Sequence, residues 1–210
     1  MERLGLDLEE ALLSLDRLAV RRIFAELAIL CAPAVIGETV IAGTLERIGA
    51  GWEEGRVALS QVYMSGRLCE ELMESILPPT GQRRIGQPKM AIACLEDHHS
   101  LGKRIVYSAL RASGYELLDY GHGIEAGRLV ELASHDDVEV LLVSVLMLRS
   151  ALKVTELRAG LDAVSPGVRI VVGGAPFRFD SQLWTQVGAD AMGSNAAEAM
   201  AIVSRWIEGR

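Results

Sequence analysis

One short loop places a histidine between an apolar segment and a helix, with a carboxylate before it and a glycine after it. His99 follows Asp97 by two residues and precedes Gly102 by three. The apolar residues 90–95 predict a buried strand, and the apolar spacing over 101–112 predicts a helix. A histidine at the carboxyl end of a strand can be offered to a ligand, whereas a core histidine is not usually placed there.

Two further groups follow predicted strands in the same half of the chain. Ser144, Leu146 and Ser150 come after a third strand, and Gly173 and Gly174 come after a fourth. In a doubly wound sheet of order 2-1-3-4-5, ligands bind beyond the carboxyl ends of the first and third strands. The glycines lack side chains, so backbone there can approach something flat and large. One sheet edge is thus expected to gather an imidazole, a carboxylate, two hydroxyls and a glycine pair.

Taken singly, each of these residues has a simpler interpretation. A lone histidine such as His99 is more often structural than a ligand, and Asp97 alone would more often cap a helix. Ser150 is expected to start a helix, and a glycine pair usually makes a tight turn. His98 is expected to point to solvent or to a phosphate, and His122 has no partner at a suitable spacing.

Nucleotide cofactors are disfavoured by missing phosphate motifs. Asp119 closes a predicted second strand, roughly where a dinucleotide ribose would require an acid. No G-x-G-x-x-G follows the first strand, and no G-x-x-x-x-G-K-[ST] occurs in the chain. Asp119 alone therefore does not support NAD or FAD.

The second half alternates strands and helices. Strands are predicted at 89–95, 115–119, 138–143, 168–172 and near 189–192, and helices at 101–112, 126–134, 150–163, 181–186 and 196–208. Strands that are almost continuous in Val, Ile and Leu indicate a parallel sheet covered on both faces. The prediction is a five-stranded, doubly wound, flavodoxin-like (Rossmann-like) α/β domain of order 2-1-3-4-5.

The first half has helical periodicity throughout. Apolar spacing predicts helices over 8–18, 21–31, 33–48 and 53–76, with Gly49 to Gly51 ending the third and a break near Gly55 as an option in the fourth. Short connections between them favour a four-helix bundle. Residues 77–88 hold three prolines, two glycines and two arginines without periodicity, as expected for a linker. The predicted organisation is a helical cap domain at 1–80, a linker at 81–88 and an α/β domain at 89–210.

Composition narrows the class of protein. The formal net charge of −7 argues against a nucleic-acid partner, which would favour a basic face. No apolar run is long enough to span a membrane, and the first residues lead into an acidic amphipathic helix instead of a signal peptide. Cys31, Cys69 and Cys94 are scattered without metal-site spacing, which is typical of reduced cysteines in a cytoplasmic protein.

Three motifs together resemble the signature of cobalamin-binding domains, which occur in the corrinoid proteins of methyltransferase systems and in cobalamin-dependent methionine synthase. They are D-x-H-x-x-G (Asp97, His99, Gly102), S-x-L (Ser144, Leu146) and Gly173-Gly174. Residues 49–66 are similar to the helical cap of the same family. The resemblance covers nearly the whole chain and is weaker over 1–30.

The resemblance implies a cobalamin whose nucleotide tail is drawn away from cobalt. His99 would then be the lower axial ligand of the metal (base-off, His-on). Asp97 corresponds to the carboxylate that accepts a hydrogen bond from the second ring nitrogen and fixes its tautomer. Ser150 corresponds to the hydroxyl that continues this relay.

The same resemblance implies that Ser144, Gly173 and Gly174 line the slot for the tail. Three positions depart from the family pattern. Glu96 stands where the family commonly has glycine, Ser100 replaces a frequent acidic residue, and Leu148 stands where a threonine hydroxyl is common. These changes leave the metal ligand in place and affect its surroundings.

The function implied is that of a carrier subunit, itself non-catalytic, that transports a methyl group on cobalt. Expected partners are a substrate-specific methyltransferase, a methyl-accepting methyltransferase that uses a pterin or a thiol, and a reductive activator. Nucleic acid and membrane are not expected partners. The main alternative is a cobalamin-sensing regulatory protein; the others are the cobalamin-binding part of a mutase and a flavodoxin-like domain that binds flavin or nothing.

Overall fold

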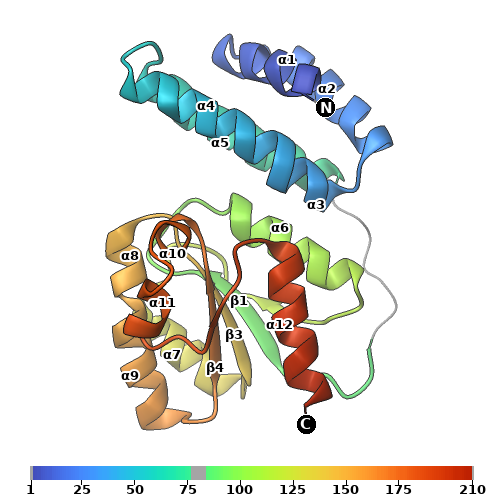
Figure 1. Cartoon of the computed structure of the whole chain (residues 1–210). Coiled ribbons are helices and arrows are strands. Elements are labelled where there is room, and N and C mark those ends of the chain that lie inside the picture. Colours follow the sequence, from blue (N-terminus) through green and yellow to red (C-terminus); the bar gives the residue numbers. More distant parts are fainter. Residues whose placement is uncertain (1, 77–83, 210) are drawn as a thin grey trace. The chain divides into compact units, whose positions relative to one another are not determined.

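The computed structural model describes residues 2–76 and 84–209 (Figure 1). The chain divides into two compact units, residues 1–78 and 79–210. The first unit is helical, and the second contains a five-stranded parallel sheet with helices. The predicted fold class is therefore confirmed. No helix within residues 2–76 or 84–209 has both the length and the apolar composition needed to cross a membrane.

The first unit is built from helices that share an apolar core. They are α1 (Glu2–Leu13), α2 (Arg17–Leu30), α3 (Pro33–Val35), the π-helical η1 (Ile36–Ile41), α4 (Ala42–Glu53) and α5 (Leu59–Ile76). Because α3, η1 and α4 follow one another without a break, the described residues of this unit form four helical stretches, as predicted. Each stretch contributes fully buried side chains, among them Leu8, Phe24, Ile48 and Met73.

The boundary between α1 and α2 differs from the prediction of a helix over 8–18. The chain leaves the helix after Leu13, and Leu15 adopts a positive φ of 56°. Asp16 then starts α2, because its Oδ1 accepts hydrogen bonds from the amides of Leu18 (3.1 Å) and Ala19 (3.0 Å). Apolar periodicity runs across this cap, which is why it misplaced the boundary.

The prediction that Gly49 to Gly51 end a helix is wrong, since α4 continues to Glu53. Gly51 instead permits close packing: a Cβ there would lie 2.8 Å from Cγ2 of the buried Val57. The helix ends where Gly55 takes a φ of +74°, a conformation that suits glycine.

The second unit has the predicted strand order. Strands β1 (Met90–Cys94), β2 (Leu118–Asp119), β3 (Val140–Ser144), β4 (Arg169–Gly173) and β5 (Ala191–Met192) lie in the order β2-β1-β3-β4-β5, and all pairs are parallel. Its helices are α6 (Leu101–Ala112), α7 (Ala126–His135), α8 (Leu148–Leu152), α9 (Val154–Val164), α10 (Ala175–Phe179), α11 (Leu183–Gln186) and α12 (Ala196–Glu208).

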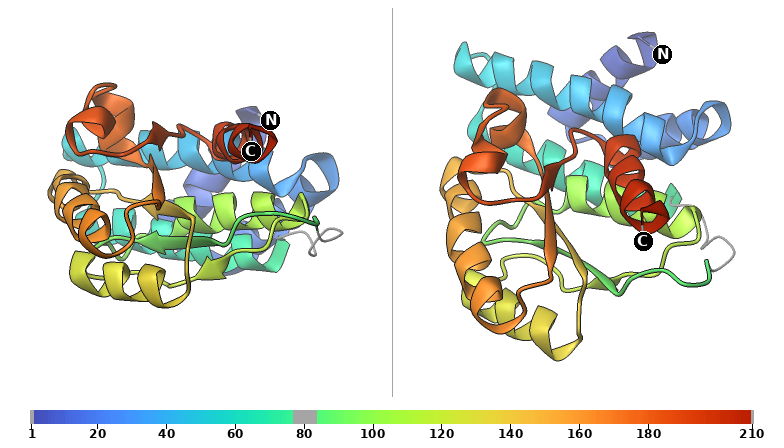
Figure 2. Two further views of the ribbon diagram at one scale, coloured as in Figure 1. Left: turned by 90° about the horizontal axis from the view of Figure 1, so that it is seen from below. Right: turned by 60° about the horizontal axis from the view of Figure 1, so that its bottom comes forward.

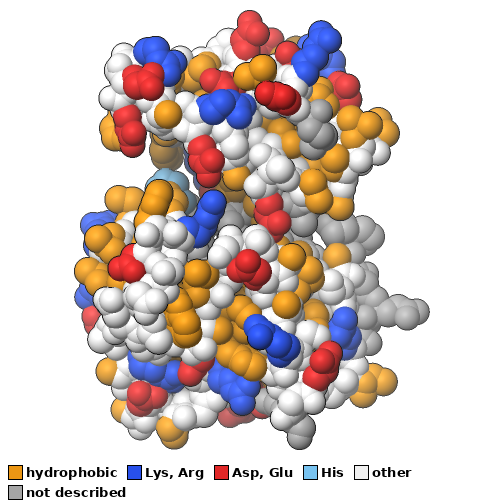
Figure 3. All heavy atoms as spheres, in the orientation of Figure 1, with side chains coloured by type: hydrophobic (Ala, Val, Ile, Leu, Met, Phe, Trp, Pro, Cys, Tyr) orange, Lys and Arg blue, Asp and Glu red, His pale blue; other side chains and the backbone are white. Residues whose placement is uncertain are grey.

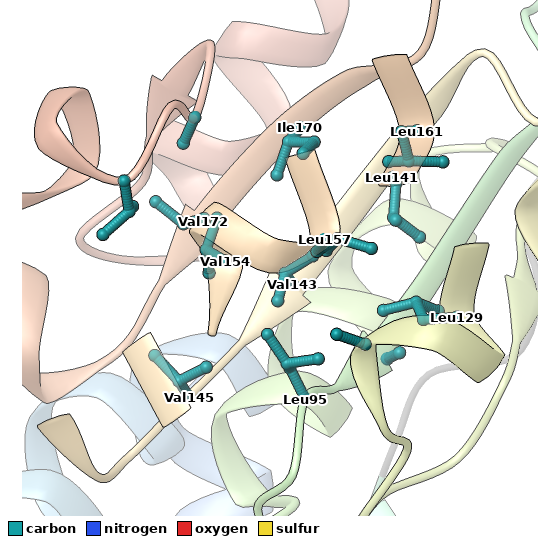
Figure 4. Packing of buried hydrophobic residues seen from close by; sticks show 14 of the residues in the cluster. Leu95, Leu129, Leu141, Val143, Val145, Val154, Leu157, Leu161, Ile170 and Val172 are labelled. Atoms are coloured by element: carbon teal, nitrogen blue, oxygen red, sulfur yellow. The ribbon is translucent and has the colours of Figure 1, made fainter. Parts of the chain in front are cut away.

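Alternate side chains of the central strands supply the two faces of the sheet. Ala91, Ala93 and Leu95 pack into one buried cluster with α7, α8, α9, α10 and α11, which Figure 4 shows from close by. Met90 and Ile92 pack into the other with α6 and α12. The helices therefore cover the sheet on both sides (Figure 2).

Two helix boundaries in this unit differ from the prediction, both near the carboxyl ends of β3 and β4. The helix predicted over 150–163 begins two residues earlier, as α8, and is interrupted before α9. The unpredicted α10 starts directly after Gly174, with Pro176 in its first turn. Both changes put short helices immediately beyond the ends of β3 and β4.

The start of the second unit includes part of the predicted linker 81–88, whose residues 81–83 lie outside the described part of the chain. The Arg84 amide donates to the carbonyl of Gly114 (3.0 Å), and its Nε donates to the carbonyl of Ser113 (2.9 Å). The Arg84 guanidinium also lies 4.3 Å from the centre of the Tyr115 ring. Arg84 is thus attached to the segment after α6.

Two alanine substitutions in α4 should have opposite effects on stability. Gly49→Ala should raise the melting temperature, because nothing lies within 4 Å of the added Cβ and alanine favours a helix by about 0.5–1 kcal/mol. Gly51→Ala should lower it, because the added methyl overpacks against Val57 at a cost of about 1–3 kcal/mol. Thermal unfolding of both variants tests this pair; equal shifts would contradict the packing role of Gly51.

Candidate functional site

The three predicted motifs meet at one edge of the sheet. Cys94, the last residue of β1, pairs with Ser144 at the end of β3, and Ser144 pairs with Gly173 at the end of β4. The loops that leave these strands therefore begin side by side. This edge is also where the strand order reverses, the position at which such sheets bind ligands.

Asp97 joins the loops that follow β1, β2 and β3. Its side chain is 3% exposed, and its Oδ2 accepts hydrogen bonds from the amides of Leu146 (2.6 Å) and Met147 (3.0 Å). Its carbonyl accepts a hydrogen bond from the amide of Gly123 (2.7 Å). The interpretation of Asp97 as the cap of the following helix is therefore wrong, since Ser100 holds the N-cap position of α6.

His99 presents an exposed imidazole two residues after this fixed carboxylate. Its backbone carbonyl accepts a contact from the thiol of Cys94 (3.6 Å). Within the described residues, no hydrogen-bond partner is found for the ring itself. Both ring nitrogens are thus available for a ligand and for a second interaction.

The adjacent His98 behaves differently. It is exposed, as expected, but its Nδ1 lies 3.4 Å from Nδ1 of His122, a residue to which the sequence assigned no role. The two imidazoles are therefore partners, although 24 residues separate them in the chain. Only the alignment of β1 and β2 brings them together, so no local spacing could have indicated this contact.

Ser150 is a buried hydroxyl without a hydrogen-bond partner. It is the third residue of α8 and fully buried, so the expectation that it starts a helix is wrong. Its Oγ finds no partner among the described residues. An unsatisfied buried hydroxyl costs about 1–3 kcal/mol of stability. Such a cost is accounted for where a bound ligand supplies the missing hydrogen bond.

Cys94 does not compete with His99 as a metal ligand at neutral pH. Burial raises the pKa of the Cys94 thiol to about 11, although nearby Lys103 and a hydrogen bond with Ser144 act in the opposite direction. The thiol therefore stays protonated, whereas metals bind the thiolate. Ser144 also lies near Gly102, where an added Cβ would be 3.8 Å from the serine Oγ.

The glycine pair is needed for contacts within the chain. Gly174 has a φ of +126°, and a Cβ there would lie 1.7 Å from the carbonyl oxygen of Val145. A Cβ at Gly173 would lie 3.0 Å from the carbonyl oxygen of Gly193. The missing side chains thus let neighbouring loops pack backbone against backbone, in addition to any role toward a ligand.

Asp119 is already engaged within the protein. It forms an ion pair with Lys103, whose side chain is 5% exposed, and accepts a hydrogen bond from the amide of Gly121 (2.8 Å). The pair joins the start of α6 to the end of β2. Lys103 was missed from the sequence, although its place directly after Gly102 was a signal that it lies at the same edge.

The backbone at Glu96 shows why the family commonly has glycine at this position. Its φ is +52°, a left-handed conformation that a glycine would adopt with less strain. Its amide nevertheless donates to the carbonyl of Ile124 (3.0 Å), which holds the loop in place. Glutamate is therefore tolerated here at some conformational cost.

Exposed apolar side chains adjoin the edge. Leu146, Met147, Leu148 and Leu152 are each about half exposed. In the space-filling view, histidine side chains (pale blue) lie beside hydrophobic ones (orange) at the upper edge of the second unit (Figure 3). Clustered apolar surface of this kind marks a ligand or protein contact.

Residues 89–203 match the family described as "B12 binding domain", and residues 6–77 match a second family of the same description. Over 218 aligned residues, the chain is 28% identical to dimethylamine corrinoid protein 1 of Methanosarcina mazei, covering 100% of this chain and 98% of the relative. It is 32% identical over 161 residues to monomethylamine corrinoid protein 1 of Methanosarcina barkeri, covering 72% and 73%. The solved structure of the M. barkeri monomethylamine corrinoid protein matches with a TM-score of 0.79 at 26% identity, covering 97% and 96%.

Asp119→Asn should destabilise the second unit by about 1–3 kcal/mol, because it leaves the buried Lys103 ammonium without its charged partner. Asparagine keeps an oxygen for the Gly121 amide, so the loss isolates the ion pair. Asp137→Asn is the matched control, since its pair with Lys89 is exposed and should matter by less than about 0.5 kcal/mol. Urea unfolding followed by circular dichroism measures both, and equal effects would contradict the assignment.

Proposed function

We propose that this chain, which belongs to the family of B12-binding domain proteins, carries a methyl group on cobalt between partner methyltransferases. The second unit has the fold of that family, and cobalamin is its cofactor. The observation that carries the proposal is the arrangement around Asp97. A buried carboxylate held by two amides lies two residues from an exposed imidazole without a partner.

The residues present fit a cobalamin held from below by a protein imidazole. When bound, the cofactor supplies the cobalt ion on which a methyl group travels. We assign His99 as the lower axial ligand, acting through one nitrogen of its neutral ring. Since Oδ2 of Asp97 is committed to the amides of Leu146 and Met147, we assign Oδ1 as the acceptor for the second ring N–H.

The unpartnered hydroxyl of Ser150 supports this assignment. We propose that it joins the Asp97–His99 relay when the cofactor is bound, which would supply the hydrogen bond that the described chain does not provide. A carboxylate behind the imidazole stabilises its neutral N–H tautomer and raises its basicity as a ligand. A proton added to the ring nitrogen that faces the metal would release His99, so this relay can couple ligation to protonation.

We assign Gly102, Ser144, Leu146, Gly173 and Gly174 to the edge along which the nucleotide tail lies. The proximity of Gly102 to the Ser144 hydroxyl supports this, because a polar group there faces a position free of side chain. For the two later glycines the structure supplies a packing role, so their proposed part is to shape the loops that border the tail.

Partner enzymes are proposed from the relatives. Those proteins are named for monomethylamine and dimethylamine, so a methylamine-specific methyltransferase is the first donor enzyme to test. A methyl-accepting enzyme that uses a pterin or a thiol and a reductive activator complete the proposed set. The names of the relatives favour this carrier role over a cobalamin-sensing regulator. The free cysteines Cys31, Cys69 and Cys94 support a cytoplasmic location.

His99→Ala should abolish the visible absorption features of imidazole coordination when the purified chain is loaded with hydroxocobalamin. Free imidazole added to the loaded variant should restore them, because the cavity left by the ring admits it. His135→Ala is the control, since His135 is exposed at the end of α7 and should change neither spectrum. Identical spectra for wild type and His99→Ala would remove His99 as the axial ligand.

Ser150→Ala should separate the cost of the buried hydroxyl from its proposed use. Without cofactor, the variant should melt about 2–4 °C higher, because an unsatisfied polar group is removed. With cobalamin, it should shift the pH at which His99 leaves the metal, followed by absorption.

Ser65→Ala is the matched control for this experiment, because Ser65 is a second buried hydroxyl without a described partner and lies in the helical unit. It should raise the melting temperature in the same way and leave the pH profile unchanged. A pH profile for Ser150→Ala that coincides with wild type would exclude the hydroxyl from the relay.

A further inference from the structure

The loop between β1 and α6 contains two adjacent imidazoles, those of His98 and His99, and only one of them can be the axial ligand. Resting on the function proposed above, we propose that His122 and Gly123 form a seat that holds His98 away from the cofactor, so that His99 alone is offered to cobalt. Both residues of the seat belong to the loop that follows β2. His122 and Gly123 are thus positioning residues: they hold His98 and act on the metal ligand, His99, only indirectly.

The contact between the two rings has the geometry of a hydrogen bond. The Nδ1 atoms of His98 and His122 lie 3.4 Å apart, the ring centres lie 5.5 Å apart, and the planes cross at 76°. One neutral imidazole must donate through Nδ1–H while the other accepts. The pair therefore occupies the Nδ1 atom of His98, one of its two possible metal-binding nitrogens.

Gly123 provides the surface against which the His98 ring lies. A Cβ at this position would be 2.6 Å from Cε1 of His98 and 3.0 Å from its Nδ1. Any side chain there would displace the ring. The φ of +68° also suits glycine, so both the turn and the seat require the same residue.

Two backbone hydrogen bonds join the loop after β2 to the segment that precedes His98. The Gly123 amide donates to the carbonyl of Asp97 (2.7 Å), and the Cys94 amide donates to the carbonyl of Gly121 (3.0 Å). The loop after β2 therefore cannot drift from the loop after β1 without breaking backbone hydrogen bonds. His122 keeps its position relative to His98 for this reason.

His99 has no comparable restraint on its ring. Within the described residues its imidazole has no hydrogen-bond partner, whereas the neighbouring ring is both hydrogen-bonded and packed. Since two neutral imidazoles are chemically equivalent donors to a metal, this difference in restraint decides between them. One hydrogen bond between side chains changes such a population by about 2- to 10-fold.

The experiment uses the full chain loaded with cobalamin and reduced to the cobalt(II) form, in which an axial nitrogen splits the electron paramagnetic resonance lines. In His99→Ala only a minor fraction of the cobalt should show this splitting, because His98 stays in its seat. In His99→Ala/His122→Ala the fraction of cobalt with axial nitrogen should rise by about 2- to 10-fold. Adding His98→Ala to that double variant should remove the signal again.

Two further arms separate the possible explanations. His99→Ala/His122→Asn should behave like His99→Ala, because the asparagine amide can replace Nδ1 as a hydrogen-bond partner. In the cofactor-free chain, nitrogen NMR should show a change in the tautomer of His98 when His122 is replaced by alanine. Both rings are exposed, so these variants should fold normally.

The outcomes distinguish this inference from the function on which it rests. If most of the cobalt in His99→Ala already shows axial nitrogen that depends on His98, or if the double variant shows no gain, the seat is overturned and the carrier role stays intact. If the wild-type cobalt shows no protein nitrogen, the proposed His99 ligation fails first, and the inference fails with it.

Discussion

The site depends on the hydrogen bonds that the backbone amides of Leu146 and Met147 donate to the carboxylate of Asp97. A buried carboxylate is stable only where donors satisfy it, and these donors come from a different loop of the sheet edge. Since the Asp97 carbonyl also accepts from Gly123, the ends of β1, β2 and β3 hold one another. His99 takes its position from this cross-linked set of loops.

The polar groups of these loops are hydrogen-bonded, but two polar groups at the site lack a hydrogen-bond partner among the described residues. The imidazole of His99 is exposed and unpartnered within the described residues, and the hydroxyl of Ser150 is buried and unpartnered there. A binding site requires a rigid surrounding and a few groups that are completed only by the ligand. The close backbone contact between Gly174 and Val145 adds to that rigidity, because no other residue fits there.

The sheet order and the meeting of the motifs could be predicted, because Val- and Ile-rich strands alternating with helices admit few topologies. Helix ends were harder: Asp16 caps α2 through local polar contacts that apolar periodicity does not report. Contacts such as His98–His122 and Lys103–Asp119 join residues from different elements. These contacts depend on how the strands align, so they could not be predicted from the sequence alone.

We propose that a nitrogen of the protein, and not of the cofactor, holds cobalt from below. The most direct measurement is electron paramagnetic resonance of the cobalt(II) form of wild-type protein grown with nitrogen-15 histidine. We expect the axial splitting to change from a triplet to a doublet, because the coordinating nucleus changes its spin from 1 to 1/2. An unchanged triplet would mean that the cofactor keeps its own base on the metal, and would exclude His99 as the axial ligand.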